Sequence, residues 1–278
     1  MIKDPITGID HALIGVRDLD AARETWTRLG FTVTPRGRHI GWGTANYCIM
    51  FRRDYIELLG IVDPGEFTND LDRFLEKREG VLGLAFATED AAAAAAELAA
   101  RGIAVDGPKD LKRILELPQG DVLPAFSLVH LSPDATPGLK AFLCQHLSRD
   151  LVWQPQWTAH PNTALGIRRV TVAVEEPEVA AQAYAEIWGR EVDVFLAKPD
   201  AADLLFGGVP LQLLKPEVLE VERLADPPFI AHLGIEVRDV AAVRACLSEA
   251  AIAFEDKGNT LLLPPEAGNG VELSFDEG

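Results

Sequence analysis

Residues 8–33 read GIDHALIGVRDLDAARETWTRLGFTV, and residues 166–192 read GIRRVTVAVEEPEVAAQAYAEIWGREV. Aligned without a gap, the two stretches place Trp26 on Tyr184. Each stretch opens with alternating apolar residues, which are typical of a strand, and continues with an apolar period near 3.6, which is typical of a helix. The chain therefore contains a repeated strand–helix unit.

The same unit occurs twice more, as GVLGLAFATEDAAAAAAELAARGIAV at 80–105 and AHLGIEVRDVAAVRACLSEAAIAF at 231–254. Each copy is followed by short apolar strands. Acidic residues precede the first and third helices and glycines follow them, as expected of helix ends: Asp18, Glu176, Gly30 and Gly189. Four βαβββ modules are therefore predicted, near residues 8–62, 80–147, 166–216 and 229–275.

The repeat predicts an α+β protein with two halves, residues 1–150 and 166–278, each holding two modules in a curved sheet. Residues 151–165, rich in tryptophan, proline and polar side chains, form the predicted linker. Four linker residues stand out: Trp153, Trp157, His160 and Asn162. Such aromatic residues favour a clamp between domains, and a lid over a site is the alternative.

Composition excludes several classes of function. The chain has 278 residues, of which 48% are hydrophobic, and 26 basic residues against 43 acidic ones give a formal net charge of -17. This balance argues against a nucleic-acid partner. No apolar run approaches the roughly 18 residues of a membrane span. Three widely spaced cysteines give neither a zinc motif nor a disulfide framework, so a cytoplasmic protein is expected. The expected oligomeric state is a monomer or a homodimer.

Paired βαβββ modules with I-D-H in a first strand and Y-I-E-L-L in a fourth strand resemble the vicinal oxygen chelate superfamily. That group includes the glyoxalase I, methylmalonyl-CoA epimerase and extradiol dioxygenase families. The run GRHIGWGTANYCIMF…DYIELLGI is similar to its uncharacterised glyoxalase-like branch. The resemblance covers nearly the whole chain. It implies that the first and fourth strands of a module are neighbours, so that side chains on one face of both strands converge in the concave side of the sheet.

Metal-ligand residue types occupy these converging positions in two of the four modules. The first and fourth modules supply His11, Glu57, His232 and Glu272, whereas the other two offer Leu82, Arg169, Gln212 and the run from Cys144 to His146. Strand alternation does not decide which residues of that run face inward. Imidazole and carboxylate side chains are suitable ligands for a divalent metal.

Two pairings of the modules are compatible with this distribution. Pairing the first module with the fourth, which we favour, assembles a complete set of His11, Glu57, His232 and Glu272. Sequential pairing instead splits the set between the halves. One half then holds His11 and Glu57, with His146 as a further candidate. The other half holds His232 and Glu272, together with Gln212.

The glycine-rich connection GRHIGWGTANYC is no phosphate loop, because no GK[ST] follows. It is expected to bring Arg38, His39, Trp42 and Asn46 near the mouth of the site. An ordinary hairpin with polar caps is the alternative. His39 and Asn46 are candidate substrate-binding residues, together with His146.

The resemblance implies a lyase or isomerase that uses Zn, Ni, Mn, Fe or Co. A small substrate would chelate the ion through adjacent oxygens, and the ion would act as a Lewis acid. Glu57 or Glu272 would leave the ion and move a proton. An extradiol-type dioxygenase is one alternative, and a metal-free small-molecule binding protein is another.

Overall fold

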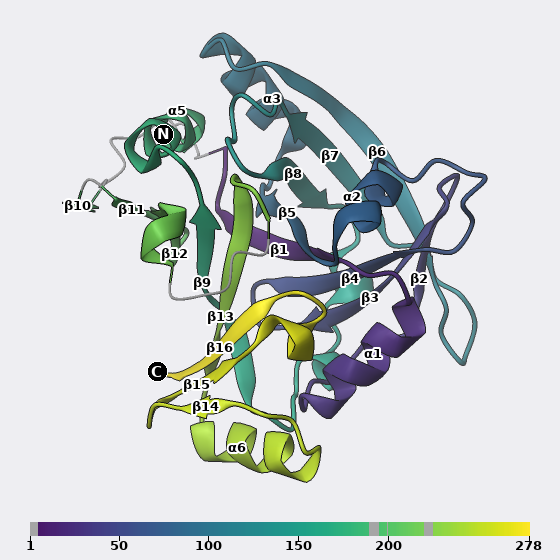
Figure 1. Ribbon diagram of the computed structural model, residues 1–278. Helices are drawn as coiled ribbons and strands as arrows, with labels where there is room; N and C mark the ends of the chain where they lie inside the picture. The colour runs from purple at the N-terminus through teal and green to yellow at the C-terminus, as the bar shows by residue number, and fades with distance from the viewer. Residues whose placement is uncertain (1–4, 189–194, 199, 220–224) are drawn as a thin grey trace.

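The computed structural model describes residues 5–188, 195–198, 200–219 and 225–278 (Figure 1). Its elements follow the predicted order of strand, helix and three strands four times. The first half contains β1 (Gly8–Gly15), α1 (Leu19–Arg28), β2 (Gly37–His39), β3 (Thr44–Met50), β4 (Tyr55–Ile61), α2 (Leu71–Lys77), β5 (Gly80–Ala87), α3 (Ala91–Ala100), β6 (Val105–Leu115), β7 (Ala125–Leu131) and β8 (Lys140–His146).

The connection between the halves contains α4 (Arg149–Val152) and a 3-10 turn, Pro155–Trp157. The second half contains β9 (Ala164–Ala173), α5 (Pro177–Trp188), β10 (Phe195–Lys198), β11 (Ala201–Phe206), β12 (Val209–Leu214), β13 (Phe229–Val237), α6 (Val240–Glu249), β14 (Glu255–Asp256), β15 (Thr260–Leu263) and β16 (Glu272–Glu277), with 3-10 turns at Pro216–Val218 and Pro265–Gly268. Gly189, expected to end the third helix, lies outside the described residues.

The first two modules close into one barrel, in the strand order β1-β4-β3-β2-β6-β7-β8-β5. Within each module the first and fourth strands are parallel neighbours, β1 with β4 and β5 with β8. Two antiparallel contacts, β1 with β5 and β2 with β6, join the modules. The favoured pairing of the first module with the fourth is therefore wrong, and the sequential alternative is found.

The last two modules form a second sheet in the order β10-β11-β12-β9-β13-β16-β15-β14. Its centre is the antiparallel pair β9 and β13. The α+β class and the two mixed sheets are as predicted, but the sheets are not alike. One is closed into a barrel, whereas the described strands of the other form an open sheet.

Both halves contribute to one continuous hydrophobic core. Trp26 of α1 is fully buried, and its indole nitrogen donates to Asn269 Oδ1 at 3.1 Å. Phe31, which follows α1, packs on Phe275 of β16 with ring centroids 5.8 Å apart. Figure 1 shows α1 beside the yellow C-terminal segment. The barrel and the second sheet are thus held in a fixed relation through α1.

Side chains of the segment predicted as a linker contact the first half of the chain. Trp153 Nε1 donates to the Phe51 carbonyl at 3.0 Å, and His160 contacts the Met50 carbonyl at 2.9 Å. Asn162 is fully buried. These side chains pair with main-chain groups of the first half, as a clamp requires. No helix within the described ranges is long and apolar enough to cross a membrane.

We expect Asn162→Ala to lower the free energy of unfolding by about 1–3 kcal/mol, the cost of leaving buried polar groups unpaired. The Asn162 amide donates to the Leu29 carbonyl at 3.0 Å, and its oxygen accepts from the Ala164 amide at 3.1 Å. Urea unfolding measures the change. The control is Gln156→Ala, which removes an exposed linker amide and should leave the free energy of unfolding within about 0.5 kcal/mol of the wild-type value. Equal midpoints for both variants would contradict the clamp.

Candidate functional site

A cavity occupies the interior of the barrel. It is narrow: a water-sized sphere can occupy about 70 Å³ of it, and it opens to solvent at one mouth. Apolar and aromatic side chains make up most of its wall. The polar part includes His11, His39, Asn46, Glu57, Arg113, His130 and Lys140. A few polar groups that converge in an apolar pocket are typical of a binding or active site.

Strand register identifies the four converging positions of the barrel. β1 and β5 run antiparallel, with His11 opposite Ala85 and Leu13 opposite Gly83. A two-fold rotation that exchanges the two strands therefore places His11 on Gly83 and Leu13 on Ala85. Glu57 lies beside Leu13 and Phe142 lies beside Ala85, so the same rotation places Glu57 on Phe142. The first module thus supplies two metal-ligand side chains and the second supplies none. Leu82 lines the cavity but is not the equivalent of His11.

A β-bulge in β1 brings an unpredicted carboxylate into the site. The pairing with β5 shifts between Ile9 and His11, which leaves Asp10 as the extra residue. Such a bulge breaks the alternation of a strand and redirects a side chain. Asp10 is 2% exposed, and its Oδ1 lies 2.6 Å from His11 Nδ1.

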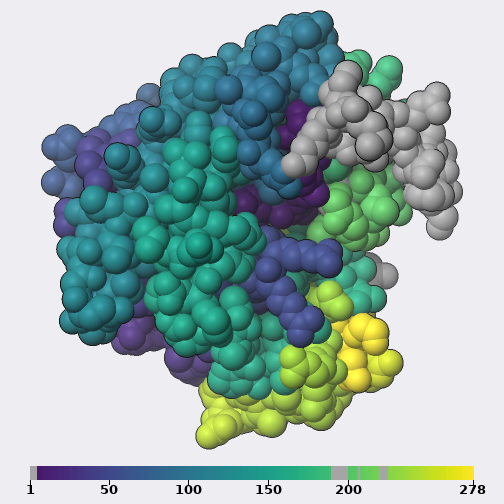
Figure 2. All heavy atoms as spheres, turned by 180° about the vertical axis from the view of Figure 1, so that it is seen from behind, coloured from purple at the N-terminus to yellow at the C-terminus, as the bar shows by residue number. Residues whose placement is uncertain are grey.

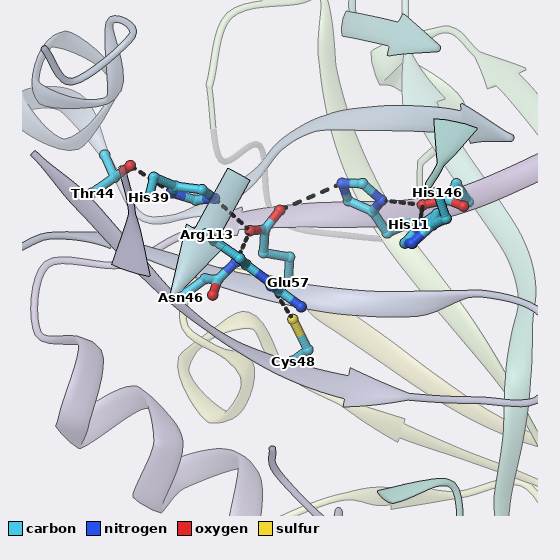
Figure 3. A network of polar contacts seen from close by, with 9 residues as sticks. His11, His39, Thr44, Asn46, Cys48, Glu57, Arg113 and His146 are labelled. Atoms are coloured by element: carbon cyan, nitrogen blue, oxygen red, sulfur yellow. Dashed lines mark hydrogen bonds and ion pairs between the residues drawn. The ribbon is translucent and has the colours of Figure 1, made fainter. Parts of the chain in front are cut away.

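The His11 imidazole is consequently held between two carboxylates. Its Nδ1 faces Asp10, and its Nε2 lies 3.4 Å from Glu57 Oε2 (Figure 3). The ring stacks on Tyr55 with centroids 4.3 Å apart. Packing and hydrogen bonding together fix the orientation of the ring, as they do for ligand histidines in metal sites.

His39 and Asn46 both reach the other oxygen of Glu57. His39 Nε2 lies 3.8 Å from Glu57 Oε1, and its Nδ1 is 2.9 Å from Thr44 Oγ1. The Asn46 amide donates to Glu57 Oε1. As expected, His39, Trp42 and Asn46 line the cavity, whereas the Arg38 guanidinium lies 3.6 Å from Glu116.

Burial and opposite charges act against one another on the pKa values of this group. Burial by itself would lower the pKa of His11, but hydrogen bonds and charge interactions with Asp10 and Glu57 raise that pKa to about 9. Burial would raise the pKa of Glu57, but His11 and the neighbouring charges lower it to about 2. Burial favours the protonated form of Asp10 too, yet His146 and His11 hold its pKa well below the usual range. In the metal-free protein His11 is therefore an imidazolium between two carboxylates.

A buried arginine that sequence reasoning missed lies on the other side of Glu57. Arg113 is 3% exposed, and its Nη1 lies 3.2 Å from Cys48 Sγ. Its Nε has no hydrogen-bond partner among the described residues. Arg113 also lies over the Phe126 ring, 5.6 Å from the centroid. The cavity thus offers a cationic donor as well as a carboxylate.

His232 and Glu272 lie on the second sheet, so the predicted set of four is not brought together. His232 matches His11, because a bulge precedes each and Asp239 caps α6 seven residues later, as Asp18 caps α1. In the strand register, however, Glu272 lies opposite His232, just as Tyr55 lies opposite His11. Glu272 therefore matches Tyr55 and does not match Glu57.

The residue of the second sheet that matches Glu57 is therefore Ser274, not Glu272. Burial and Arg169 lower the pKa of His232 to about 4, against an opposing effect of Asp276. The remaining two positions hold Arg169 and Gln212, as aligned from the sequence. A buried neutral imidazole beside an arginine is a poor counterpart to His11.

His146 lies on the far side of His11 from Glu57 and His39 (Figure 3). Its Nε2 lies 3.1 Å from Asp10 Oδ1. Gln145 faces outward, where its side-chain oxygen accepts from the Ala91 amide at 3.0 Å, so Cys144 and His146 face inward. Ligand atoms of Asp10, Cys144 and His146 lie within 4.8 Å of one another.

Comparisons with known proteins agree with this architecture. The model of a family described as glyoxalase-like domain matches residues 9–188. Comparison with curated proteins finds no match. A hypothetical protein from Staphylococcus aureus superposes with a TM-score of 0.71 at 14% identity, over 97% of this chain and 98% of that one.

Two further solved structures share the fold. A mutant of 4-hydroxymandelate synthase from Streptomyces coelicolor gives a TM-score of 0.62 at 12% identity, over 98% of this chain and 93% of that one. A xylose isomerase-like TIM barrel/4-hydroxyphenylpyruvate dioxygenase fusion protein gives 0.57 at 12% identity, over 99% of this chain and 50% of that one. At these identities the matches show the fold alone.

We expect Asp10→Asn to lower the pKa of His11 from about 9 in the chelator-treated protein, because a neutral amide no longer offsets the burial of the imidazolium. NMR titration of the imidazole resonances measures the shift. The raised pKa contributes stability that is fully present below the unfolded value near 6.5 and is lost as the pH rises through about 9. Asp20→Asn, which removes an exposed carboxylate of α1, is the control. A His11 pKa that is unchanged in Asp10→Asn would contradict the role of Asp10.

Proposed function

We propose that the barrel cavity is the active site of a divalent-metal-dependent lyase or isomerase, on the premise that this chain belongs to the glyoxalase-like domain family of the vicinal oxygen chelate superfamily. The observation that carries the proposal is the arrangement of Asp10, His11 and Glu57. The bond from His11 Nδ1 to Asp10, 2.6 Å long, leaves Nε2 free to face Glu57 across 3.4 Å. A carboxylate behind a histidine that presents its other nitrogen is the usual support of a metal ligand.

The residues present fit a metal with few protein ligands. Nitrogen and carboxylate ligands bind zinc at about 2.0–2.2 Å, so two donor atoms 3.4 Å apart can contact one ion. His39, whose Nε2 lies 3.8 Å from the other oxygen of Glu57, is the candidate third ligand. Gly83 and Phe142 offer no ligand atoms at the matched positions, which leaves that side of the cavity for substrate. His232 and Glu272 lie outside this site, so the proposal does not use them.

When bound, the metal supplies Lewis-acid stabilisation of negative charge on a substrate oxygen. The chain itself supplies the acid–base chemistry. Glu57 is ionised, because its neighbours lower its pKa to about 2, and its place in the cavity wall makes it the candidate to accept a proton from a carbon next to a carbonyl. Asn46 donates to the oxygen of Glu57 that His39 also approaches, and it holds the carboxylate in place.

The substrate class follows from the polar groups of the cavity. A small molecule with a carbonyl beside a hydroxyl or carboxylate can place its adjacent oxygens toward His11 and Glu57. Arg113, with its unpaired Nε, is available to a further anionic oxygen. The leucine and phenylalanine side chains around these groups exclude water and so strengthen the polar contacts.

A metal-free binding protein for a small organic anion is the second candidate function. It is favoured by Arg113, a buried cation 5.6 Å from the Phe126 ring centroid, and by the absence of ligand atoms at Gly83 and Phe142. In that case the imidazolium of His11 would remain the partner of Asp10 and Glu57.

Elemental analysis of protein purified without chelator tests the first candidate. We expect a transition metal in wild type and at least a tenfold weaker affinity in Glu57→Gln, because the neutral amide is a much poorer ligand than the carboxylate; removal of an outer-shell partner alone costs about 10–100-fold. The matched control is Glu116→Gln, which changes a glutamate paired with Arg36 outside the cavity.

Wild-type protein that neither contains metal nor takes it up on reconstitution would refute the metal enzyme and favour the anion-binding protein. Equal metal affinity in Glu57→Gln and Glu116→Gln would show that the ion is held elsewhere.

A further inference from the structure

A second group of metal-ligand side chains lies where the barrel meets the second sheet. Asp10 of β1 and Cys144 and His146 of β8 line a crevice between the two halves, separate from the mouth of the barrel cavity. Figure 2 shows the purple N-terminal segment recessed between the teal second module and the green second half. The crevice gives solvent and solutes a path to these three side chains.

The local strand structure explains why these residues meet. β5 lies between β1 and β8, so their side chains must cross it. At this end of the barrel β5 presents only small side chains, Ala85 opposite His11 and Ala87 opposite Cys144. The bulge at Asp10 turns its carboxylate to the same side.

One observation points to a metal ion at this group: the ligand atoms of the three residues lie within 4.8 Å of one another. A second observation concerns the other edge of the imidazole ring, because His146 Nε2 already faces Asp10 Oδ1 at 3.1 Å. The His146 side chain is 5% exposed, yet its Nδ1 has no hydrogen-bond partner within the part of the chain that the structure describes. Buried polar atoms are normally paired, so an unpaired imidazole nitrogen requires an explanation.

Aromatic packing holds the His146 ring in place. Its centroid lies 4.9 Å from that of Phe126 and 4.9 Å from that of Trp153, both edge to face. Cys144 is 2% exposed and cannot turn away into solvent. A thiol, an imidazole and a carboxylate held in this way form a preorganised ligand set.

We propose that Asp10, Cys144 and His146 form a second metal site, which takes a zinc-type divalent ion and keeps at least one coordination position open toward the crevice. One sulfur, one nitrogen and one oxygen ligand suit an ion of intermediate softness, as in zinc sites with three protein ligands. On binding, the S–H bond of Cys144 breaks, a sulfur–metal bond forms and the proton passes to solvent. The thiolate and Asp10 then balance the charge of the ion.

This site is distinct from the one proposed for His11 and Glu57, although both use Asp10. There Asp10 orients His11 and does not contact the ion. In the second site Asp10 is itself a ligand of the ion, and His11 donates a hydrogen bond to Asp10 without contacting the ion. An ion at the second site therefore joins β1 to β8 across β5 and closes the inner end of the barrel.

Cobalt titration of the chelator-stripped, full-length protein tests the proposal, because a cobalt–thiolate bond gives a near-ultraviolet charge-transfer band that nitrogen and oxygen ligands do not give. We expect the band in wild type and its loss in Cys144→Ser. His146→Gln should weaken the affinity for cobalt by at least about 10–100-fold, the loss that follows even from removal of an outer-shell partner. Cys246→Ser, which removes the partly exposed thiol of α6, is the matched control and should keep the band.

Glu57→Gln separates this proposal from the proposed function. If it loses one equivalent of cobalt but keeps the band, both sites exist. If it keeps the band and the full stoichiometry, the second site stands and the barrel metal does not. A folded wild type without the band, a band that survives Cys144→Ser, or a band lost in Glu57→Gln overturns the second site. Circular dichroism of each variant verifies its fold. If Cys144→Ser does not fold, the cobalt band of the wild type and the cobalt affinity of His146→Gln test the second site.

Discussion

The antiparallel pairing of β1 with β5 determines which side chains share the cavity. It relates the two modules by a local two-fold axis, so each converging position of one module has a counterpart in the other. The same pairing contains the bulge at Asp10, which breaks the alternation of β1 between Ile9 and His11. Without that extra residue the side chain before His11 would point to the opposite face, toward the helices. Both the pairing and its irregularity are therefore needed to build the acid–base group.

The two modules of the barrel have diverged in opposite directions. The first places His11 and Glu57 in the cavity, and the second places Gly83 and Phe142 at the same positions. At these four positions the cavity is consequently polar on one side and apolar on the other, while Arg113, His130 and Lys140 of the second module add polar groups elsewhere in its wall. The proposed function uses His11 and Glu57 for the ion and the proton, and Phe142 and its neighbours for the carbon skeleton of a small molecule.

The repeated modules, the order of strands and helix along each module and the α+β class could be read from the sequence, because apolar periodicity records which face of each element is buried. The sequence also indicated that one cavity would hold His11, His39, Asn46 and Glu57, since each lies on a different strand of the first module. The pairing of modules could not, because strand edges carry little sequence information about their partners. The favoured grouping of His11 with His232 therefore followed residue type, whereas the structure follows chain order.

Side chains that depend on irregular backbone or on distant elements were missed. Asp10 stands beside the predicted ligand His11, yet strict alternation would turn it away from the site. Arg113 lies on β6, a strand whose first half is exposed, and nothing in its neighbours marks it as a buried cation. Cys144 and His146 were undecided because the facing of β8 depends on its pairing with β5 and β7.

The second sheet shows how much the charge state of His11 depends on the carboxylates beside it, Asp10 and Glu57. His232 occupies the same position after the same bulge, but the bulged residue there is Ala231. With no carboxylate behind it and with Arg169 nearby, burial dominates and the pKa of His232 falls to about 4, whereas that of His11 rises to about 9. The two histidines have similar burial and similar strand geometry, so the difference comes from the charges around them. The carboxylates of Asp10 and Glu57, which Ala231 and Ser274 replace in the second sheet, thus separate a charged histidine from a neutral histidine of the core.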